Sequence, residues 1–319
     1  MKFRPCIDIH NGKVKQIVGS SLSDGVNGDN TAGSGHGRDG NGNTLTIRSF
    51  ARENFVSDND GAFFGNMYRE MNLPGGHIIL LNPAGTPEYE ADIEQARLAM
   101  EAYPGGLMIG GGITAGNAER FLDMGATHVI VTSYVFKNGR VDMERLEKLR
   151  SAVGRDRLVL DLSCRRRPAG ADTKTTGDTA VGEKIVSATD IGAKTTGSIT
   201  GEENRDETYY IVTDRWQRFT DVPLNMETLD MFSEYSSEFL IHAVDVEGKA
   251  RGIEKQVASL LGDWGKLPVT YAGGVSSFED LEALRELGQN RLDVTIGSAL
   301  SIFGGNMDFE EVVRYLAEA

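Results

Sequence analysis

The chain has 319 residues, and 33 Lys and Arg stand against 47 Asp and Glu, so its formal net charge is −14. A surface this acidic repels the phosphates of nucleic acids and anionic lipids, so we expect neither nucleic acid nor a membrane as a partner. Hydrophobic residues make up 39% of the chain, which is enough for a buried core and excludes a disordered protein. The N-terminus lacks the apolar stretch of a secretory signal, and we expect a cytoplasmic protein of enzyme size.

Short apolar or β-branched runs alternate eight times with amphipathic stretches along the chain, a pattern typical of strand–helix units around a parallel sheet. The predicted strands are Phe3 to Ile9, His77 to Leu81, Leu107 to Gly110, His128 to Val131, Leu158 to Leu162, Glu238 to His242, Val269 to Ala272 and Asp293 to Ile296. The predicted helices are Gly61 to Met71, Glu88 to Ala102, Ala115 to Met124, Met143 to Val153, Met226 to Tyr235, Gly252 to Leu261, Ser277 to Leu287 and Asp308 to Leu316. We expect Ser276 and Glu279 to form a capping box before the seventh helix.

Eight such units predict an α/β fold of the TIM-barrel class, a (βα)8 barrel in a single domain over residues 1–319. Because this class usually needs about 250 residues, the surplus falls in two long insertions, at about residues 20–53 after the first strand and 166–208 after the fifth. The first insertion is rich in glycine and the second in threonine, so we predict that both are flexible. Surface decoration and a lid ordered by substrate both remain open as roles.

Three pairs of segments indicate that the barrel consists of two similar halves. The pairs are Ile109–Thr114 with Tyr271–Ser276, Val131–Ser133 with Ile296–Ser298, and Cys6–Ile9 with Val159–Leu162. The offsets, from 111 to 273, from 133 to 298 and from 8 to 161, are 162, 165 and 153 residues. This near-constant spacing predicts a duplicated half-barrel of four units.

Paired glycines after a strand let the backbone approach an anion closely, and barrels often bind phosphate at the loops after strands seven and eight. We predict one phosphate site at those loops and, by the repeat, a second one after strands three and four. The predicted phosphate-binding residues are Gly273, Gly274, Gly297 and Ser298 for the first site and Gly111, Gly112, Thr132 and Ser133 for the second. The substrate expected from these two sites is a small molecule with a phosphate at each end.

Several segments resemble the eukaryotic-type phosphoribosylformimino-aminoimidazole carboxamide ribotide isomerases of histidine biosynthesis. The resemblance covers most of the chain outside the two insertions and is carried by Phe3–Gly19, Asn54–Ser57, Gly110–Ile113, Val129–Ser133, Val159–Arg165, Phe239–Gly248, Tyr271–Gly274 and Ile302–Asn306. It implies a duplicated (βα)8 barrel and a bis-phosphorylated ribotide substrate. It also implies an Amadori rearrangement, in which an aminoaldose becomes an aminoketose without a metal or an organic cofactor.

This rearrangement needs one acid, which protonates the ring oxygen, and one base, which removes the proton from C2. Asp8 and Asp161 each end an apolar strand in one half of the barrel, where a charge has no structural reason to sit. The resemblance assigns Asp8 as the base and Asp161 as the acid, but the sequence does not decide which is which. Turn capping is the alternative role for either carboxylate.

We assign expected roles to five other residues in and around the predicted loops. The resemblance assigns Trp216 to stacking on the aminoimidazole carboxamide ring, with anchoring of the insertion as the alternative. We expect Asp245 to bind a ribose hydroxyl or assist proton transfer, and His10 to shape the Asp8 site. We expect His242 to be a hydrogen-bonded wall residue and Glu247 a solvated loop charge. No cysteine or histidine spacing indicates a metal site.

The predicted function is therefore an aldose–ketose isomerase of histidine biosynthesis that uses two aspartates and no cofactor, and we expect a monomer. An isomerase that also accepts phosphoribosylanthranilate is one alternative, because that substrate undergoes the same rearrangement. A second is a binding barrel that keeps both phosphate sites but has no turnover. A third is the ammonia-using cyclase of the same pathway, which would need a glutaminase partner.

Overall fold

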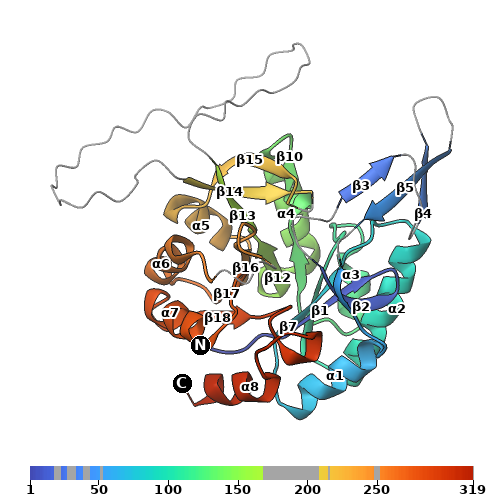
Figure 1. The fold of residues 1–319 in the computed structure, drawn as a ribbon. Coiled ribbons are helices and arrows are strands. Elements are labelled where there is room, and N and C mark those ends of the chain that lie inside the picture. The colour runs from blue at the N-terminus through green and yellow to red at the C-terminus, as the bar shows by residue number, and fades with distance from the viewer. Residues whose placement is uncertain are drawn as a thin grey trace, which may run out of the picture.

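The computed structural model describes residues 1–17, 23–26, 34–38, 44–50, 53–167, 208–214, 216–247 and 252–318. Within these residues, eight parallel strands alternate with eight helices that surround them (Figure 1). The barrel strands are β1 (Cys6–His10), β7 (Gly76–Leu80), β8 (Leu107–Gly110), β9 (Val129–Val131), β12 (Leu158–Asp161), β16 (Glu238–His242), β17 (Val269–Ala272) and β18 (Leu292–Thr295). The helices are α1 (Gly61–Glu70), α2 (Pro87–Ala102), α3 (Ala118–Asp123), α4 (Met143–Val153), α5 (Met226–Ser233), α6 (Lys255–Trp264), α7 (Phe278–Leu287) and α8 (Phe309–Ala317).

The parallel strands run in chain order around the sheet, and the chain's first residues close the circle. Each barrel strand pairs with its neighbours from β1 through β18. Phe3 then pairs in parallel with Val294 of β18, and the backbone N–H of Arg4 donates to the carbonyl of Val294 at 2.8 Å. The predicted α/β barrel of the TIM class is confirmed.

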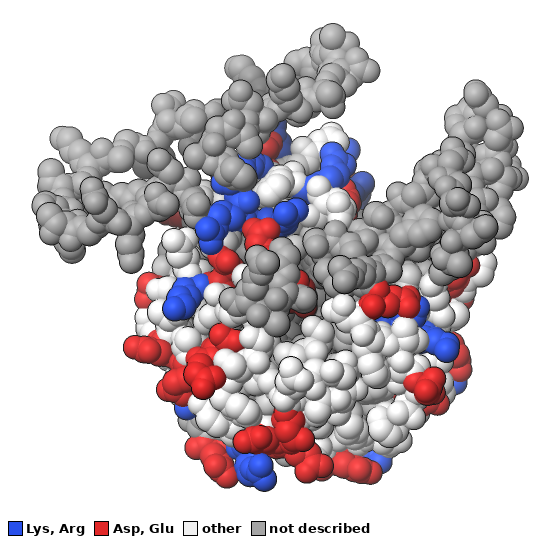
Figure 2. Space-filling model, in the orientation of Figure 1, with Lys and Arg blue, Asp and Glu red and all other residues white. Residues whose placement is uncertain are grey.

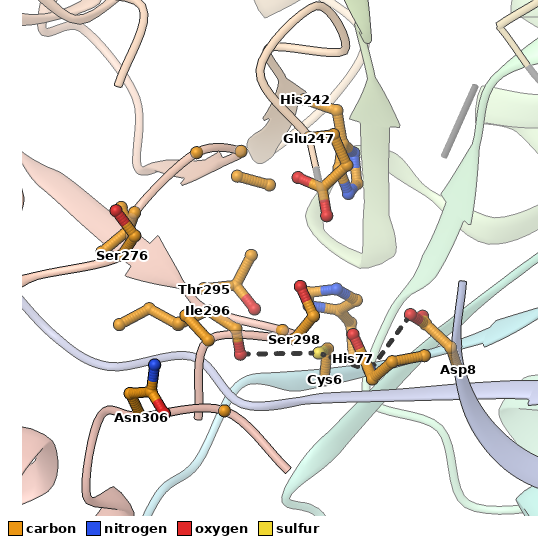
Figure 3. Close-up of a pocket in the computed structure, with 18 residues that line it drawn as sticks. Cys6, Asp8, His77, His242, Glu247, Ser276, Thr295, Ile296, Ser298 and Asn306 are labelled. Carbon is orange, nitrogen blue, oxygen red and sulfur yellow. Dashed lines mark hydrogen bonds between the residues drawn. The ribbon is translucent and has the colours of Figure 1, made fainter. Parts of the chain in front are cut away.

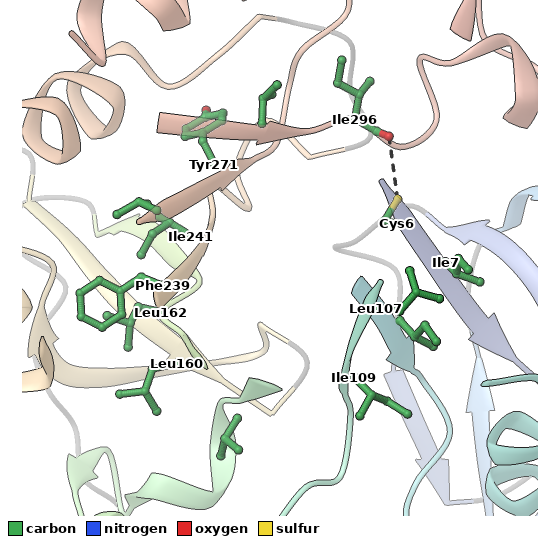
Figure 4. Close-up of a cluster of buried hydrophobic side chains, with 14 of the residues drawn as sticks. Cys6, Ile7, Leu107, Ile109, Leu160, Leu162, Phe239, Ile241, Tyr271 and Ile296 are labelled. Carbon is green, nitrogen blue, oxygen red and sulfur yellow. Dashed lines mark hydrogen bonds between the residues drawn. The ribbon is translucent and has the colours of Figure 1, made fainter. Parts of the chain in front are cut away.

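Strand alternation divides the apolar residues into two layers, because successive side chains of a strand point to opposite faces. Residues such as Ile7, Leu107, Leu160 and Phe239 face the helices, where they belong to a continuous buried cluster (Figure 4). The other face of the same strands fills the barrel interior with a small second cluster. Its buried members are Met108, Ile130, Val159, Leu240 and Ala272.

Several antiparallel strands, which the sequence did not predict, extend the barrel. β2 (Lys13–Ile17) forms a hairpin with β1, and β6 (Glu53–Val56) pairs with β2. β13 (Cys164–Arg167), β14 (Thr208–Thr213) and β15 (Arg218–Pro223) form a separate sheet directly after β12. A short hairpin joins β10 (Phe136–Lys137) to β11 (Arg140–Val141). Short 3-10 helices occupy Ser133–Val135, Arg155–Arg157 and Ser301–Phe303.

The two predicted insertions lie partly outside the described residues. Of the first, the structure describes β6 and a three-stranded antiparallel sheet of β3 (Ser23–Val26), β4 (Ser34–Arg38) and β5 (Thr44–Phe50). Of the second, residues 168–207 lie outside the described residues. Their predicted flexibility stays a prediction. None of the described helices has the length and apolarity that a membrane crossing would require.

One predicted helix cap was wrong by one residue. The capping box before α7 is formed by Ser277 and Asp280, and each side chain bonds the backbone N–H of the other. Ser276 also bonds Asp280, through its N–H and its hydroxyl, both at 2.9 Å. The carboxylate of Asp280 is short enough to reach all of these donors, so it replaces the expected Glu279.

Candidate active site

Three polar residues face the barrel interior at the C-terminal ends of their strands. Asp8 on β1 shares the face of Cys6, Asp161 ends β12 on the face of Val159, and His242 ends β16 on the face of Leu240. β12 and β16 are paired neighbours, with Asp161 opposite Leu240 in the register. The sheet therefore brings all three side chains to the mouth where barrel enzymes build their sites.

Two cavities open at this mouth. The first, here called the Asp8 cavity, has a volume of about 170 Å³. Its lining comprises Cys6, Asp8, Gln16, His77, His242, Glu247 and residues 272–276, 295–299 and 305–306. The second, here called the Trp216 cavity, has a volume of about 520 Å³. Its lining comprises residues 79–84, 110–113, Ile130, 132–134, Asp161, 212–214, Trp216 and Gln217.

Each cavity contains one predicted catalytic aspartate and one predicted glycine pair. Gly273 and Gly274 line the Asp8 cavity, while Gly111 and Gly112 line the Trp216 cavity. All four glycines have positive φ, with 99° and 66° in the first half of the barrel and 116° and 78° in the second. A Cβ atom at Gly111 would lie 2.1 Å from the Leu80 carbonyl oxygen. The two loops therefore share one conformation that only glycine adopts readily.

Asp8 lies in a buried setting that favours its protonated form. Burial raises the pKa of its carboxyl from 3.8 to about 7, the charge of Glu247 adds to this rise, and His242 and Gln16 oppose it. The amide of Gln16 donates to Asp8 Oδ2 at 3.3 Å. A carboxyl group with a pKa near neutrality can both accept and release a proton at physiological pH.

Asp161 lies in the opposite electrostatic setting. Burial alone would raise its pKa, but His242 and hydrogen bonds from Ser163 and Thr132 lower it below its ordinary value. Ser163 donates to Oδ1 through its backbone N–H at 2.9 Å and its hydroxyl at 2.7 Å. Thr132 Oγ1 donates to Oδ2 at 3.1 Å. Asp161 is therefore ionised at neutral pH.

His242 and Trp216 connect the two cavities. His242 lines the Asp8 cavity, and its Nδ1 lies 3.7 Å from Asp161 Oδ1, an atom on the wall of the Trp216 cavity. The ring of Trp216 lies 5.5 Å from the His242 ring between centroids. The indole N–H of Trp216 donates to Ser163 Oγ at 2.9 Å. Figure 3 shows His242 and Glu247 on one side of the Asp8 cavity, with Asp8, His77 and Ser298 on the other.

The remaining predicted anion-binding residues have distinct environments. Gly297 and Ser298 line the Asp8 cavity, and a Cβ atom at Gly297 would lie 2.4 Å from Gln16 Oε1. Thr132 and Ser133 line the Trp216 cavity. Their hydroxyls already have protein partners, since Thr132 donates to Asp161 and Ser133 Oγ accepts the backbone N–H of Asp214 at 3.0 Å.

Asp245 and His10 do not line either cavity. The carboxylate of Asp245 accepts Arg165 Nε at 3.0 Å and the backbone N–H of Arg166 at 2.8 Å, both from β13. His10 is buried at the end of β1, with its Nδ1 3.9 Å from Glu53 Oε1 on β6. Asp245 thus links the loop after β16 to β13, and His10 of β1 lies close to Glu53 of β6.

Sequence reasoning missed three residues of the site and assigned a wrong role to a fourth. Gln16 and His77 line the Asp8 cavity, and Ser163 holds Asp161. Burial lowers the pKa of His77 to about 3, so this ring is neutral. Glu247 was expected as a solvated charge, but it lines the Asp8 cavity and burial raises its pKa. No sequence signal places Gln16 beside Asp8, because the register of β1 and β2 pairs Asp8 with Lys15.

Charge is unevenly distributed over the described surface. Figure 2 shows Asp and Glu spread over the lower part of the face in view and Lys and Arg gathered higher up, in the region of β13 to β15. Arg165, Arg166 and Arg167 all lie on β13. Within the part of the chain that the structure describes, no group of three or more His, Cys, Asp or Glu side chains is arranged to hold a metal ion.

Comparison with known proteins gives one consistent result. Residues 2–308 match the model of a family described as "Histidine biosynthesis protein". A chloroplastic protein of Medicago truncatula is 42% identical over 99% of this chain and 81% of its own length. Proteins of Neurospora crassa and Saccharomyces cerevisiae are 36% and 33% identical, each over 98% of this chain, and over 98% and 97% of their own lengths. All three are named 1-(5-phosphoribosyl)-5-((5-phosphoribosylamino)methylideneamino) imidazole-4-carboxamide isomerase.

Proposed function

Because the chain belongs to the histidine biosynthesis protein family, we propose that it catalyses the aldose–ketose isomerisation for which its relatives are named. The substrate would be a ribotide with a phosphate at each end. The chemistry moves protons within one molecule, so it needs neither a redox cofactor nor a metal ion. A cytoplasmic location and a monomeric state belong to the same proposal, although the relative from M. truncatula is named chloroplastic.

One observation carries this proposal: two cavities open at the barrel mouth, and each combines a positive-φ glycine pair with a strand-end aspartate. Such loops let phosphate oxygens approach backbone N–H groups. A phosphate in each cavity would place the middle of the substrate between Asp8 and Asp161. The arginines of β13 would attract a doubly phosphorylated ligand to the mouth of an otherwise acidic protein.

The electrostatic setting of Asp8 suits acid–base catalysis. An acid at the end of the barrel where Asp161 lies protonates the ring oxygen, and the C1–O4 bond breaks. The lone pair of the amino nitrogen forms a C1=N bond in the same step. Asp8 then takes the C2 proton, the C–H electrons form C1=C2, and the nitrogen regains its lone pair. Protonation of C1 and loss of the proton from the 2-hydroxyl then give the ketone, so substrate and product have the same composition. A pKa of about 7 suits Asp8 for this exchange.

Turnover of the ribotide by purified protein, followed spectroscopically, tests the proposal. We expect Asp8→Asn to lower kcat by at least about 10²-fold, because an amide cannot accept the C2 proton. Binding of the ribulosyl product, measured by calorimetry, should persist. Asp123→Asn, an exposed position on α3, is the matched control and should keep wild-type kcat.

The same assay separates the alternatives. Wild-type protein that binds the ribotide without isomerising it would exclude the isomerase and support a binding barrel. Parallel turnover of phosphoribosylanthranilate would show the broader specificity. Unchanged kcat in Asp8→Asn would remove Asp8 from the mechanism.

A further inference from the structure

The carboxylate of Asp161 is held by its neighbours as a hydrogen-bond acceptor. Three donors surround it, two from Ser163 on Oδ1 and one from Thr132 on Oδ2. Hydrogen bonds donated to a carboxylate favour its ionised form. A carboxylate held in this way is a poor proton donor, so a neighbouring group is the better candidate for the acid.

The imidazole of His242 is the neighbour that can carry this proton. Its Nδ1 faces Asp161 Oδ1 at 3.7 Å, a separation suited to an ion pair. Catalytic hydrogen bonds are often this long before substrate binds and shorten in the complex. A carboxylate at one ring nitrogen fixes the orientation of a histidine and stabilises its protonated form.

Trp216 extends this arrangement into a chain. Its indole N–H donates to Ser163 Oγ, whose hydroxyl donates to Asp161, and its ring lies against that of His242. An aromatic face stabilises a neighbouring cation. The charge of a protonated His242 is thus favoured from two sides.

His242 lies across the Asp8 cavity from Asp8 (Figure 3). We infer that His242 is the general acid of the isomerisation and that Asp161 is the positioning residue that keeps its imidazole protonated and aimed. The inference rests on the proposed function. In the step, the N–H of the imidazolium gives its proton to the ring oxygen as the C1–O4 bond breaks, which leaves a neutral imidazole. The proton that later leaves the substrate is taken by Asp8.

Every charged or titratable group around His242 bears on its titration. Burial lowers its pKa, but Asp161 of β12, Glu247 of the loop after β16 and Asp8 of β1 raise it, and the net pKa is above the ordinary value. His77 of β7 faces the same cavity as a neutral ring. Glu247 is the rival acid, because its carboxyl shares the cavity and burial raises its pKa.

The test compares pH profiles of kcat/KM for His242→Asn, Asp161→Asn and Glu247→Gln. In the wild type, activity should fall at alkaline pH as the acid loses its proton. We expect His242→Asn to lower kcat by about 10²- to 10⁴-fold and to abolish this alkaline limb. Asp161→Asn should keep the limb but move it to lower pH, because His242 loses the carboxylate that raises its pKa. Glu247→Gln should keep the limb.

Two further measurements distinguish loss of the acid from a structural change in the His242 variants. His242→Ala should regain activity with added imidazole, and it should bind the ribulosyl product in a calorimeter. His128→Asn is the matched control, since His128 precedes β9 at the opposite end of the barrel and should give the wild-type profile.

The outcomes are separable. If the alkaline limb of the kcat/KM profile disappears in Asp161→Asn and only shifts in His242→Asn, Asp161 is the acid. A limb that disappears only in Glu247→Gln would make Glu247 the acid, and either result overturns the inference while the isomerase function stands. Wild-type protein without turnover would overturn the proposed function itself.

Discussion

At the scale of single residues, two aspartates at equivalent strand ends are given opposite protonation preferences by their neighbours. Asp8 is buried with a single amide donor, and its pKa rises to about 7. Asp161 receives three hydrogen bonds and faces His242, and its pKa falls. The two halves of the barrel therefore contain similar strand-end carboxylates whose neighbours shift their pKa values in opposite directions.

Gln16 is the residue that tunes Asp8. Its amide hydrogen bond lowers the pKa of Asp8 because it stabilises the carboxylate. Gln16→Met should remove this donor at similar volume, raise the pKa of Asp8 and move the ascending limb of the kcat/KM profile to higher pH. Activity at pH 6 should drop several-fold more than activity at pH 8. Gln289→Met, at an exposed position, serves as the control, and an unmoved limb in Gln16→Met would contradict this role.

At the scale of elements, helix α2 supports both halves of the site. Tyr89 donates its hydroxyl to the Gly111 carbonyl at 2.8 Å, which fixes the glycine pair of the Trp216 cavity. One turn later, Asp92 accepts the N–H of Gly12 at 2.7 Å and that of Asn82 at 3.3 Å. Gly12 forms the turn between β1 and β2, the strands that carry Asp8 and Gln16. A single helix thus sets the positions of both cavities' walls.

Asp92→Asn should lower the free energy of unfolding by about 1–3 kcal/mol, because the amide leaves a buried backbone N–H without an acceptor. The folded-state pKa of Asp92 is raised from 3.8 to about 7, chiefly by burial. Its contribution to stability is therefore largest in acid and is lost as the pH rises through 7. Urea unfolding at pH 5 and pH 8 should show the larger loss at pH 5.

Glu90→Gln provides the control on the same helix. Its carboxylate pairs with Arg120 on the exposed surface at 3.0 Å, and its replacement should change stability by less than about 0.5 kcal/mol. An equal loss at both pH values in Asp92→Asn would mean that Asp92 does not titrate as described.

At the scale of the whole molecule, the two half-barrels predict two independent phosphate sites. Gly111→Ala and Gly273→Ala each place a Cβ against a carbonyl oxygen, at 2.1 and 2.7 Å, on a backbone with positive φ. Calorimetric titration of the wild type with inorganic phosphate should show two sites, and each variant should retain one. Gly154→Ala, which has φ of 78° but nothing within 4 Å of the new Cβ, should retain both. Two sites in Gly111→Ala or Gly273→Ala would refute the assignment of that loop.

The sequence predicted the fold best where a single physical rule decides the local structure. Three barrel strands, β8, β16 and β17, have the predicted ends, since continuous apolar runs of this length fit buried parallel strands. Both glycine pairs were expected directly after a strand, and the structure has them there with positive φ, a conformation that glycine adopts readily. Their role in binding phosphate stays a prediction.

The antiparallel additions escaped prediction for the opposite reason. β13 reads Cys164–Arg167 with three arginines, and its stability comes from pairing with β14 and from aromatic rings near those arginines. Likewise, the roles of Gln16 and Glu247 depend on where the chain folds back toward Asp8, which no local pattern encodes. Burial of a polar side chain is a property of tertiary structure.

The pairing of Phe3 with Val294 bears on how the protein reaches its native state. During synthesis, the residues around Phe3, which precede β1, must wait for a partner strand almost 300 positions later, and until then their backbone groups lack that partner. Contacts of such sequence separation are slow to form. We expect nascent chains that end before β18 to depend on chaperones, because their unpaired strands favour aggregation.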